Sequence, residues 1–322
     1  MTVDIIIPTY KPDETLCLLL HGLREQTFVI HRVMLLNTDE ELWKKAVSAY
    51  PIEQILDELP CPYTVKQIKK SEFDHGGTRR LGAQMSDADV VMFMTQDAVP
   101  ADTHLTEKLM EALGQENVAV AYARQLPKED CHIAEQYTRQ FNYPDESRIK
   151  TKADIGTLGI KTFFCSDVCA AYKRELFWQL GGFETPMIFN EDMIFAAKAV
   201  EAGYGVAYAA DAKVLHSHNY TAVQQFRRNF DLAVSQKQHP EIFEQVSSES
   251  EGMKLVKKTV LYLCRIGKPW LIVPFGLQCV GKYAGYRMGK RYEKLTQEQI
   301  LKYTMNPGYW DIVWRENEEQ KR

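Results

Sequence analysis

Short, almost continuous apolar runs separated by helix-like stretches constrain the fold of this chain more than any other feature. Val3–Ile7 is such a run, ended by Pro8, and Asp89–Thr95 (DVVMFMT) is a second. Runs of this kind are typical of strands buried on both faces of a parallel sheet. We predict further strands at 31–37, 64–68 and 118–122, and helices at roughly 13–26, 39–50, 77–86 and 102–114. The alternation predicts an α/β fold with a mostly parallel central sheet, whose ligands bind beyond the carboxyl ends of the strands.

The pattern in the second half of the chain is less regular. We expect a buried strand at Phe163–Tyr172 (FFCSDVCAAY), a helix at 190–202, an extended segment at 206–216 and a helix at 224–236. The polar stretch at 247–252 (SSESEG) marks the strongest domain boundary. The sequence therefore predicts a catalytic domain over 1–250 and a basic, amphipathic C-terminal helical region over 251–322.

Charge is distributed unevenly along the chain. The net charge is −4 and the pI about 6.1, so the chain as a whole lacks the excess of positive charge that is typical of nucleic-acid-binding proteins. Residues 253–294 nevertheless hold ten Lys or Arg residues and one acid, Glu293, for a net charge of +9, so the remainder carries −13. A division this sharp indicates two surfaces with different partners, one of them anionic.

The basic region contains one apolar segment, Pro269–Gly281 (PWLIVPFGLQCVG). It has thirteen residues, is broken by Pro274 and Gly276, and is shorter than the roughly 20 apolar residues that a spanning helix needs. Its basic and aromatic flanks favour a segment that lies on an anionic membrane surface. The alternative is a helical appendage that packs on the catalytic domain or on a second subunit of a homo-oligomer.

The cysteines and the amino-terminal residues indicate the cellular compartment of the protein. The seven cysteines stand in no metal-like spacing, which favours free thiols in a reducing compartment. Met1–Asp4 leads directly into a strand pattern without the features of a signal peptide. We expect a cytoplasmic protein, attached peripherally to the inner face of the cell membrane.

Thr95-Gln96-Asp97 stands at the carboxyl end of a predicted buried strand. A carboxylate at this position lies at the mouth of the ligand crevice, where it can anchor Mg²⁺ or Mn²⁺ against a substrate diphosphate. A helix N-cap explains Asp97 equally well.

A second motif is Phe73–Arg80 (FDHGGTRR). Glycines that open a helix, with two arginines in its first turn, can present N–H groups and guanidinium donors to phosphate oxygens. A glycine turn with solvated arginines is the alternative. The dinucleotide fingerprint G-x-G-x-x-G is absent, which argues against a nicotinamide enzyme.

Acidic and imidazole side chains follow later in the chain. Glu191 and Asp192 open a predicted helix, where they serve either as a general base or as a favourable helix cap. His216 and His218 end a predicted extended segment, where a neutral imidazole can complete a metal shell or contact a phosphate.

These motifs, in this order, resemble the inverting GT-A glycosyltransferases of family 2. The words EFDHGGTRRLG, MTQDA, GGFETPMIFNEDMIFAAKAVEAGY and HSHNYT are similar to those of the rhamnosyltransferase branch. The resemblance covers roughly residues 1–240, and YRMGKRYEKL near the carboxyl terminus is also similar to that branch.

The resemblance implies a GT-A fold and a nucleotide-diphospho-sugar donor, dTDP-rhamnose. It implies that a hydroxyl of a growing, lipid-linked cell-surface polysaccharide accepts the sugar. The donor-binding residues it implies are Thr9, Tyr10, Asn37, Asp39, His75, Gly76, Arg79 and Gln96. It also implies Asp192 as the catalytic base with Glu191 beside it, and Asp97 with His216 or His218 as contacts of Mg²⁺ or Mn²⁺.

Two positions depart from the family pattern. Thr95 stands where the usual Asp-x-Asp motif has its first carboxylate, and Arg80 stands where the rhamnosyltransferase-like word has Asn. Two alternatives stay open. The first departure supports a non-catalytic protein that binds sugar nucleotides, and a nucleotidyltransferase-like enzyme would use the glycine and arginine residues at the helix start but would need no base at Asp192.

Overall fold

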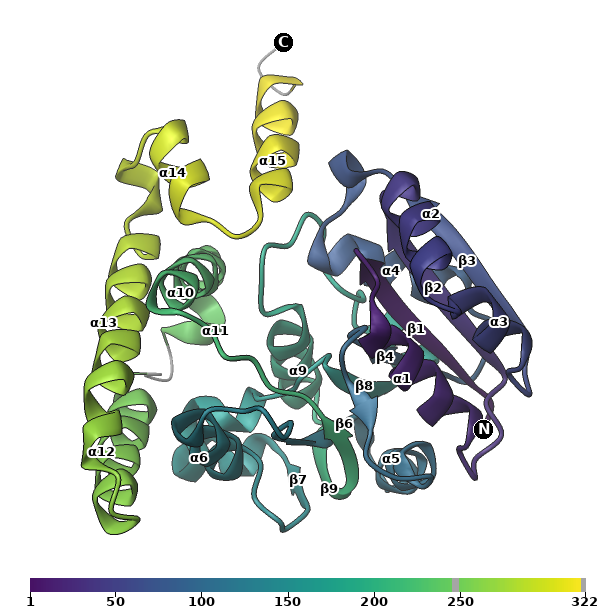
Figure 1. Cartoon of the computed structure of the whole chain (residues 1–322), viewed down its shortest axis with the longest axis horizontal. Helices are drawn as coiled ribbons and strands as arrows, with labels where there is room; N and C mark the ends of the chain where they lie inside the picture. Colours follow the sequence, from purple (N-terminus) through teal and green to yellow (C-terminus); the bar gives the residue numbers. More distant parts are fainter. Residues whose placement is uncertain (245–248, 320–322) are drawn as a thin grey trace. The chain divides into compact units, whose positions relative to one another are not determined.

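The computed structural model describes residues 1–244 and 249–319, which pack as two compact units (Figure 1). The first unit comprises Met1–Leu126, Tyr143–Thr185 and Glu191–His216, and the second comprises Pro127–Asn142, Pro186–Asn190 and Ser217–Arg322. The predicted boundary at 247–252 lies partly outside the described residues. The functional division at residue 250 stays a prediction.

The first unit begins with four parallel strands. They are β1 (Val3–Tyr10), β2 (Arg32–Thr38), β3 (Tyr63–Ile68) and β4 (Val90–Met94), in the order β3-β2-β1-β4. Side chains of β1 and β4 are buried on both faces, as the apolar runs predict. The register pairs Thr9 with Asn37 and Asn37 with Gln67. Polar side chains of three strands therefore meet at one edge of the sheet.

Helices between these strands cover the sheet and begin where the sequence supplies caps. They are α1 (Glu14–Arg24), α2 (Glu40–Ala49), α3 (Ile52–Asp57), α4 (His75–Met85) and α5 (Leu105–Leu113). The carboxylates of Asp13, Asp39 and Asp74 each accept a hydrogen bond from a first-turn N–H of α1, α2 and α4. Such a cap stabilises a helix by about 1 kcal/mol.

The second half of the sheet is mixed, so the prediction of a mostly parallel sheet is wrong. Among the described residues, it adds β5 (Val99–Pro100), β6 (Val118–Leu126), β7 (Arg148–Lys150), β8 (Cys169–Lys173) and β9 (Gly205–Leu215). Strand β8 lies antiparallel between β4 and β6, and β9 pairs parallel with β6 but antiparallel with β5 and β7. A strand buried on both faces satisfies its apolar pattern in either direction, so the pattern did not fix the direction of β8.

The predicted strand Phe163–Tyr172 is correct only in its second half. Phe163 ends a 3₁₀ turn, η3 (Gly159–Phe163), and a loop precedes β8. The Nζ of Lys150 donates hydrogen bonds to the carbonyls of Lys161 and Phe164 and holds this loop out of the sheet. The buried Lys150 has a pKa lowered to about 7, chiefly by desolvation.

Short helical elements complete the first unit. Helix α9 (Glu191–Glu201) confirms the predicted helix at 190–202. The other elements are η1 (Lys70–Glu72), η2 (Lys152–Asp154), α7 (Ile155–Leu158) and α8 (Arg174–Gln179).

The second unit is helical in its described residues. Its helices are α6 (Ile133–Asn142), α10 (Ala222–Gln238), α11 (Pro240–Phe243), α12 (Glu249–Arg265), α13 (Ile272–Gly289), α14 (Gln297–Tyr303) and α15 (Pro307–Glu319), with 3₁₀ turns η4 (Pro269–Leu271) and η5 (Tyr292–Lys294). No helix in the described ranges is long and apolar enough to cross a membrane.

Close packing of α13 on α10 organises this unit. Gly281, Gly285 and Gly289 recur at every fourth residue of α13, and a Cβ at any of them would overlap the α10 backbone at Ala222, Phe226 or Phe230. The absence of these side chains lets the two helix backbones approach, and Figure 1 shows α10 and α13 side by side.

A buried carboxylate on α10 anchors the segment that follows α14. Asp231 accepts hydrogen bonds from Thr304 Oγ1 (2.6 Å), Met305 N (2.8 Å) and Asn306 Nδ2 (3.0 Å). These three donors leave the desolvated carboxylate satisfied. Trp310 of α15 packs with Phe230 and Val234 of α10 in the same unit.

Candidate active site

The carboxyl ends of β1 and β2 form the first part of the site. Thr9 Oγ1 donates a hydrogen bond to Asn37 Oδ1 (3.1 Å), and Asn37 Nδ2 donates to Gln67 Oε1 of β3 (2.7 Å). Asn37 Nδ2 also reaches the carbonyl of Asp39, which begins α2 with a positive φ of 77°. The structure thus brings together three of the predicted donor-binding residues, two of which, Thr9 and Asn37, are buried.

Tyr10 and Gln96 join the end of β1 to the turn after β4. The amide of Gln96 accepts a hydrogen bond from Tyr10 N and donates one to Tyr10 O, both at 2.9 Å. The ring of Tyr10 is 39% exposed. The Nζ atoms of Lys11 and Lys70 lie 5.3 Å and 6.0 Å from its centroid, so an aromatic face and two cations meet at this edge.

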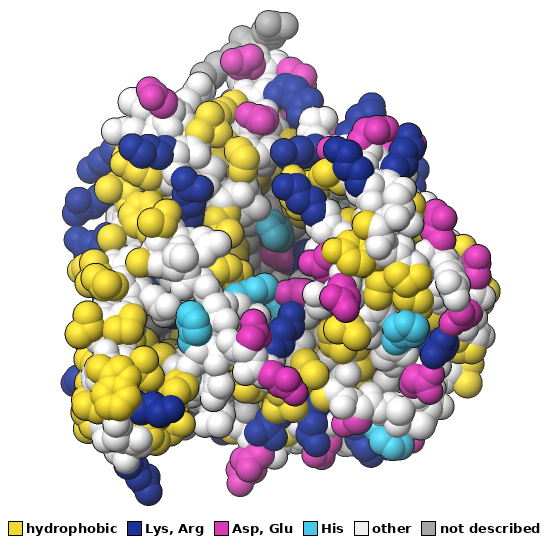
Figure 2. All heavy atoms as spheres, viewed as in Figure 1, with side chains coloured by type: hydrophobic (Ala, Val, Ile, Leu, Met, Phe, Trp, Pro, Cys, Tyr) yellow, Lys and Arg dark blue, Asp and Glu magenta, His cyan; other side chains and the backbone are white. Residues whose placement is uncertain are grey.

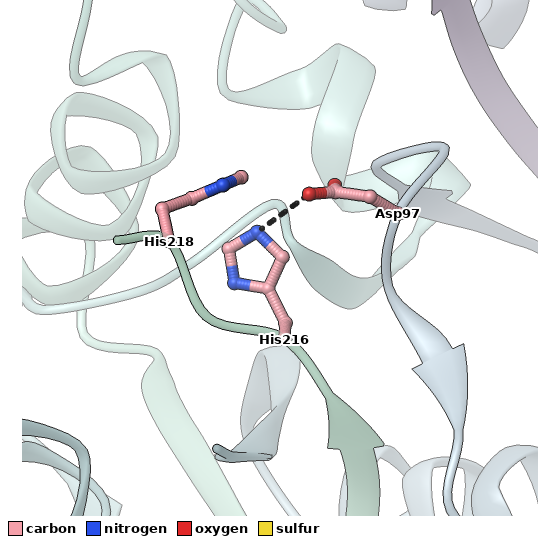
Figure 3. Close-up of side chains that lie close together, drawn as sticks. All are labelled: Asp97, His216 and His218. Atoms are coloured by element: carbon pink, nitrogen blue, oxygen red, sulfur yellow. Dashed lines mark ion pairs between the residues drawn. The ribbon is translucent and has the colours of Figure 1, made fainter. Parts of the chain in front are cut away.

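Asp97 lies in the turn after β4, and His216 follows β9. Their Oδ2 and Nε2 atoms are 3.5 Å apart (Figure 3). The Nδ1 of His216 lies 3.0 Å from Gln125 Oε1, and Gln125 Nε2 donates to Ser166 Oγ (2.9 Å). With Gln125 Oε1 as the acceptor of the Nδ1 proton, Nε2 is the nitrogen that faces Asp97, and it can bind a metal when it carries no proton. This orientation by a second hydrogen bond is typical of histidine ligands of metals.

His218 is the second residue after His216 in the chain and is drawn with the pair in Figure 3. Asp97, His216 and His218 each offer a ligand atom, and these atoms lie within 4.8 Å of one another. One carboxylate and two imidazoles form a donor set that suits Mn²⁺ better than Ca²⁺, because imidazole is a ligand of transition metals.

Helix α4 directs Arg79 inward and not toward solvent. Arg79 is 5% exposed, and its Nη1 lies 3.1 Å from Glu191 Oε1 while its Nε lies 3.3 Å from Asp167 Oδ2. His75 Nδ1 lies 4.0 Å from the same Glu191 oxygen, and Gly76 is buried in the first turn. Arg79, which was predicted to contact the donor, already contacts two carboxylates of the protein.

Arg80, the second departure from the family pattern, has a structural partner. Its Nη1 donates hydrogen bonds to the carbonyls of Gly181 (2.6 Å) and Phe183 (3.0 Å), and its guanidinium lies 5.1 Å from the ring of Trp178. Gly181 and Gly182 both have positive φ angles, which the turn requires. Arg80 therefore fixes this turn.

Glu191 and Asp192 open α9 and differ in their surroundings. Glu191 is buried against Arg79, whereas Asp192 retains exposed surface. Asp192 Oδ2 accepts a hydrogen bond from Asp167 N (3.1 Å), and Oδ1 accepts one from Met193 N (2.7 Å). Two backbone donors hold this carboxylate in one orientation while part of the residue stays accessible.

Desolvation dominates the electrostatics of the cluster. Burial, followed by the charge of Glu191, raises the pKa of Asp192 to about 7. Burial also raises the pKa of Asp167 well above its usual range, although Arg79 opposes the rise. An acid with a pKa near neutrality exchanges a proton readily, which is the requirement for a general base.

Two residues of the site escaped the sequence-based prediction, Gln125 and Asp167. Asp167 offered one signal. It is the single charge within the apolar run at 163–172, and a carboxylate in such a run is buried only with partners. Gln125 offered none, because its role depends on the contacts with His216 and Ser166.

Comparison with known sequences finds a family and two close relatives. The model of glycosyl transferase family 2 matches residues 4–181. The chain is 35% identical over 315 residues to the O-antigen chain rhamnosyltransferase RfbN of Salmonella typhimurium, with 97% of both proteins covered. It is 39% identical over 248 residues to the O-antigen chain rhamnosyltransferase WbaN of Salmonella anatum, covering 76% of this chain and 78% of that protein.

Comparison with solved structures supports the fold. The mannosyltransferase PcManGT from Pyrobaculum calidifontis, in complex with GDP-Man and Mn²⁺, matches with a TM-score of 0.53 and 14% identity, over 97% of this chain and 86% of that one. S. aureus TarS 1–349, in complex with UDP-GlcNAc, matches with a TM-score of 0.52 and 14% identity, over 91% and 92%. The predicted GT-A architecture is confirmed as a mixed α/β fold of this type.

We predict that Asp97→Ala weakens the Mn²⁺-dependent binding of a nucleoside diphosphate by more than about tenfold, because the carboxylate ligand is lost. The measurement is calorimetric titration with and without Mn²⁺. Asp87→Ala is the control, since Asp87 belongs to a separate group with Asp4 and His31 that also places possible ligands close together. Weaker Mn²⁺ binding in Asp87→Ala and not in Asp97→Ala would contradict the assignment.

Proposed function

The chain belongs to glycosyl transferase family 2, and from that premise we propose that this glycosyltransferase transfers L-rhamnose from dTDP-rhamnose with inversion. The acceptor is a hydroxyl of a growing, lipid-linked cell-surface polysaccharide. Identity of 35% to an O-antigen chain rhamnosyltransferase over 97% of the chain supports the sugar and the class of acceptor. The observation that carries the chemistry is the carboxylate of Asp192, a half-buried residue, held by two backbone N–H groups.

The donor nucleotide binds at the carboxyl edge of β1 and β2. The exposed ring of Tyr10 offers a stacking face for the base, and Lys11 and Lys70 beside it favour the diphosphate charge. Thr9, Asn37 and Asp39 line the base and ribose pocket, and Gln96 fixes the backbone of Tyr10. His75 and Gly76 lie at the start of α4, where first-turn N–H groups and the helix dipole favour a negatively charged group of the donor.

Asp97, His216 and His218 would hold Mg²⁺ or Mn²⁺. The hydrogen bond between His216 Nδ1 and Gln125 supports this assignment, because it leaves Nε2 as a lone-pair donor next to the carboxylate. A divalent ion bound there supplies charge neutralisation for the departing diphosphate. The two imidazoles supply ligands that the missing first acid of the Asp-x-Asp motif would otherwise provide.

Asp192 acts as the general base. It takes the proton of the acceptor hydroxyl while the acceptor oxygen bonds to the anomeric carbon. The bond from this carbon to the diphosphate oxygen breaks on the opposite face, and its electron pair leaves with the nucleoside diphosphate. One displacement inverts the configuration, and no covalent sugar intermediate on the protein is needed.

Helices α12 and α13 attach the enzyme to the cytoplasmic face of the membrane. Trp270, Val273, Leu277 and Val280 lie along one side of η4 and α13 at helical spacing, and each is 61–70% exposed. Figure 2 shows yellow side chains gathered over these helices with dark blue ones among them. This apolar stripe suits a helix that lies in the membrane interface.

Positively charged side chains around the apolar stripe indicate a membrane with anionic lipids. Lys254, Lys257 and Arg265 on α12 and Arg287 on α13 are exposed, and Glu293 is the one acid between residues 253 and 294. Each such cation near an anionic leaflet contributes about 1 kcal/mol at low salt. We therefore assign the stripe to an anionic lipid surface, which also carries a lipid-linked acceptor.

For the donor, we expect dTDP-rhamnose to be turned over faster than UDP-glucose or UDP-galactose at equal concentration. The measurement is release of nucleoside diphosphate in the presence of a lipid-linked acceptor. Faster turnover of either hexose donor would overturn the rhamnose assignment and leave the family membership intact.

For the base, Asp192→Asn should lower single-turnover transfer by about 10²–10⁴ with donor affinity nearly unchanged, because the amide cannot take a proton. Wild-type transfer should rise with pH through about 7, since the carboxylate must be ionised to accept the acceptor proton and its pKa is raised to that value. Glu191→Gln is the matched control, and we expect it to retain more activity. Near-normal transfer by Asp192→Asn beside an inactive Glu191→Gln would shift the base by one residue.

For the membrane, we expect the full chain to cosediment with phosphatidylglycerol vesicles at low salt. The triple substitution Val273→Ser, Leu277→Ser and Val280→Ser should abolish this binding. Leu18→Ser with Val29→Ser is the control, because these apolar residues are also exposed but lie in the first unit. Unchanged vesicle binding, or a dimer in sedimentation velocity that only the triple variant dissociates, would overturn the lipid assignment.

A further inference from the structure

Asp167 connects three parts of the first unit that the proposed reaction uses. It lies in the loop before β8, its backbone N–H donates to Asp192, and its carboxylate contacts Arg79 of α4. Arg79 in turn contacts Glu191 of α9. We propose that Asp167 is a positioning residue for transfer, which holds the base and the arginine in their working orientation. This inference rests on the proposed role of Asp192.

The position of Asp167 is itself fixed by a buried hydroxyl. Tyr172 OH donates to Asp167 Oδ1 at 2.6 Å. The ring of Tyr172 is fully buried among the aromatic rings of Phe93, Phe183 and Phe195, whose centroids lie 5.1–5.5 Å away. A tyrosine packed this way has one rotamer, so its hydroxyl marks a fixed point for the loop.

The contact between Asp167 and Arg79 is needed by both side chains. Asp167 Oδ2 and Arg79 Nε are buried and make no hydrogen bond within the described ranges, yet they lie 3.3 Å apart as an ion pair. Separating them would leave two desolvated polar groups without a partner. The pair therefore keeps Arg79 in the cluster and away from solvent.

The neighbouring residue extends the same loop toward the proposed metal ligands. Ser166 Oγ accepts a hydrogen bond from Gln125, which accepts one from His216. The Ser166-Asp167 dipeptide thus contacts, directly or through one side chain, both the base and an imidazole of the proposed ion site. A shift of this loop would move both at once.

Charged and titratable groups surround Asp192 from several elements. Glu191 adjoins it on α9, Arg79 faces it from α4, and Asp167 and Cys165 face it from the loop before β8, with Tyr172 behind them on β8. Asp167→Asn makes this side chain uncharged at every pH, so that it lowers the negative charge of the cluster wherever Asp167 is ionised in the wild type, and it keeps the backbone N–H. Less negative charge in the cluster favours ionisation of Asp192, so its titration moves to lower pH.

The test compares Asp167→Asn with Asp231→Asn in the full-length enzyme. Asp231 is a buried, hydrogen-bonded carboxylate in the second unit and serves as the structural control. We expect Asp167→Asn to lower kcat by about 10–100-fold, to leave donor affinity within about twofold, and to shift the acidic limb of the pH–rate profile to lower pH. Asp231→Asn should leave the limb in place, whatever its effect on Tm.

A second variant covers the case in which Asp167→Asn does not fold. Tyr172→Phe keeps the ring and removes the hydroxyl that fixes Asp167, and we expect a smaller loss of kcat with unchanged donor affinity. Wild-type kcat and pH profile in both variants would overturn the inference. Loss of donor affinity with an unshifted limb would make Asp167 a donor contact instead.

The outcome for Asp192→Asn separates this inference from the proposed function. If Asp192→Asn abolishes transfer while Asp167→Asn behaves as wild type, only the positioning role fails. If Asp192→Asn transfers normally, the base assignment fails and the role of Asp167 fails with it.

Discussion

The buried guanidinium of Arg79 is the interaction on which the rest of the catalytic unit depends. It contacts Glu191 at 3.1 Å and Asp167 at 3.3 Å. These side chains come from α4, the loop before β8 and α9, which are far apart in the sequence. Removing one partner of a buried charge pair costs about 3–5 kcal/mol, because the other charge is left uncompensated. The three segments are therefore held together at the point where Asp192 begins its helix.

The sheet supplies the second constraint, since it decides which strand ends share an edge. Parallel pairing of β1 with β2 places Thr9 beside Asn37. Parallel pairing of β6 with β9 places Gln125 beside Val214, close to the end of β9 and to His216, which follows it. Strand β8 runs antiparallel between β4 and β6, so the Ser166-Asp167 loop that precedes it lies at the same edge. The mixed sheet is thus what allows a loop preceding a strand to meet residues that follow strands.

The parts of this arrangement that local sequence determines could be predicted, and the parts that depend on distant partners could not. Apolar runs predicted β1 and β4, and the place of Asp97 after the second run predicted it as a residue of the edge, whereas Thr9 was predicted from the family resemblance. The direction of β8, the loop at 164–168 and the inward turn of Arg79 were not predicted. Each depends on a contact with another segment, such as that of Lys150 with Phe164 or of Arg79 with Glu191.

The charge balance of the cluster explains why one of its carboxyl groups has a pKa near neutrality. Asp167, Glu191 and Asp192 share one guanidinium, so full ionisation would leave an excess of negative charge in a desolvated place. Such a cluster retains a proton near neutral pH. Asp192 is the half-buried member with a pKa near 7, which suits the role of general base proposed for it. In the proposed mechanism, burial of Asp167 and Glu191 beside Arg79 sets the proton affinity of the proposed base.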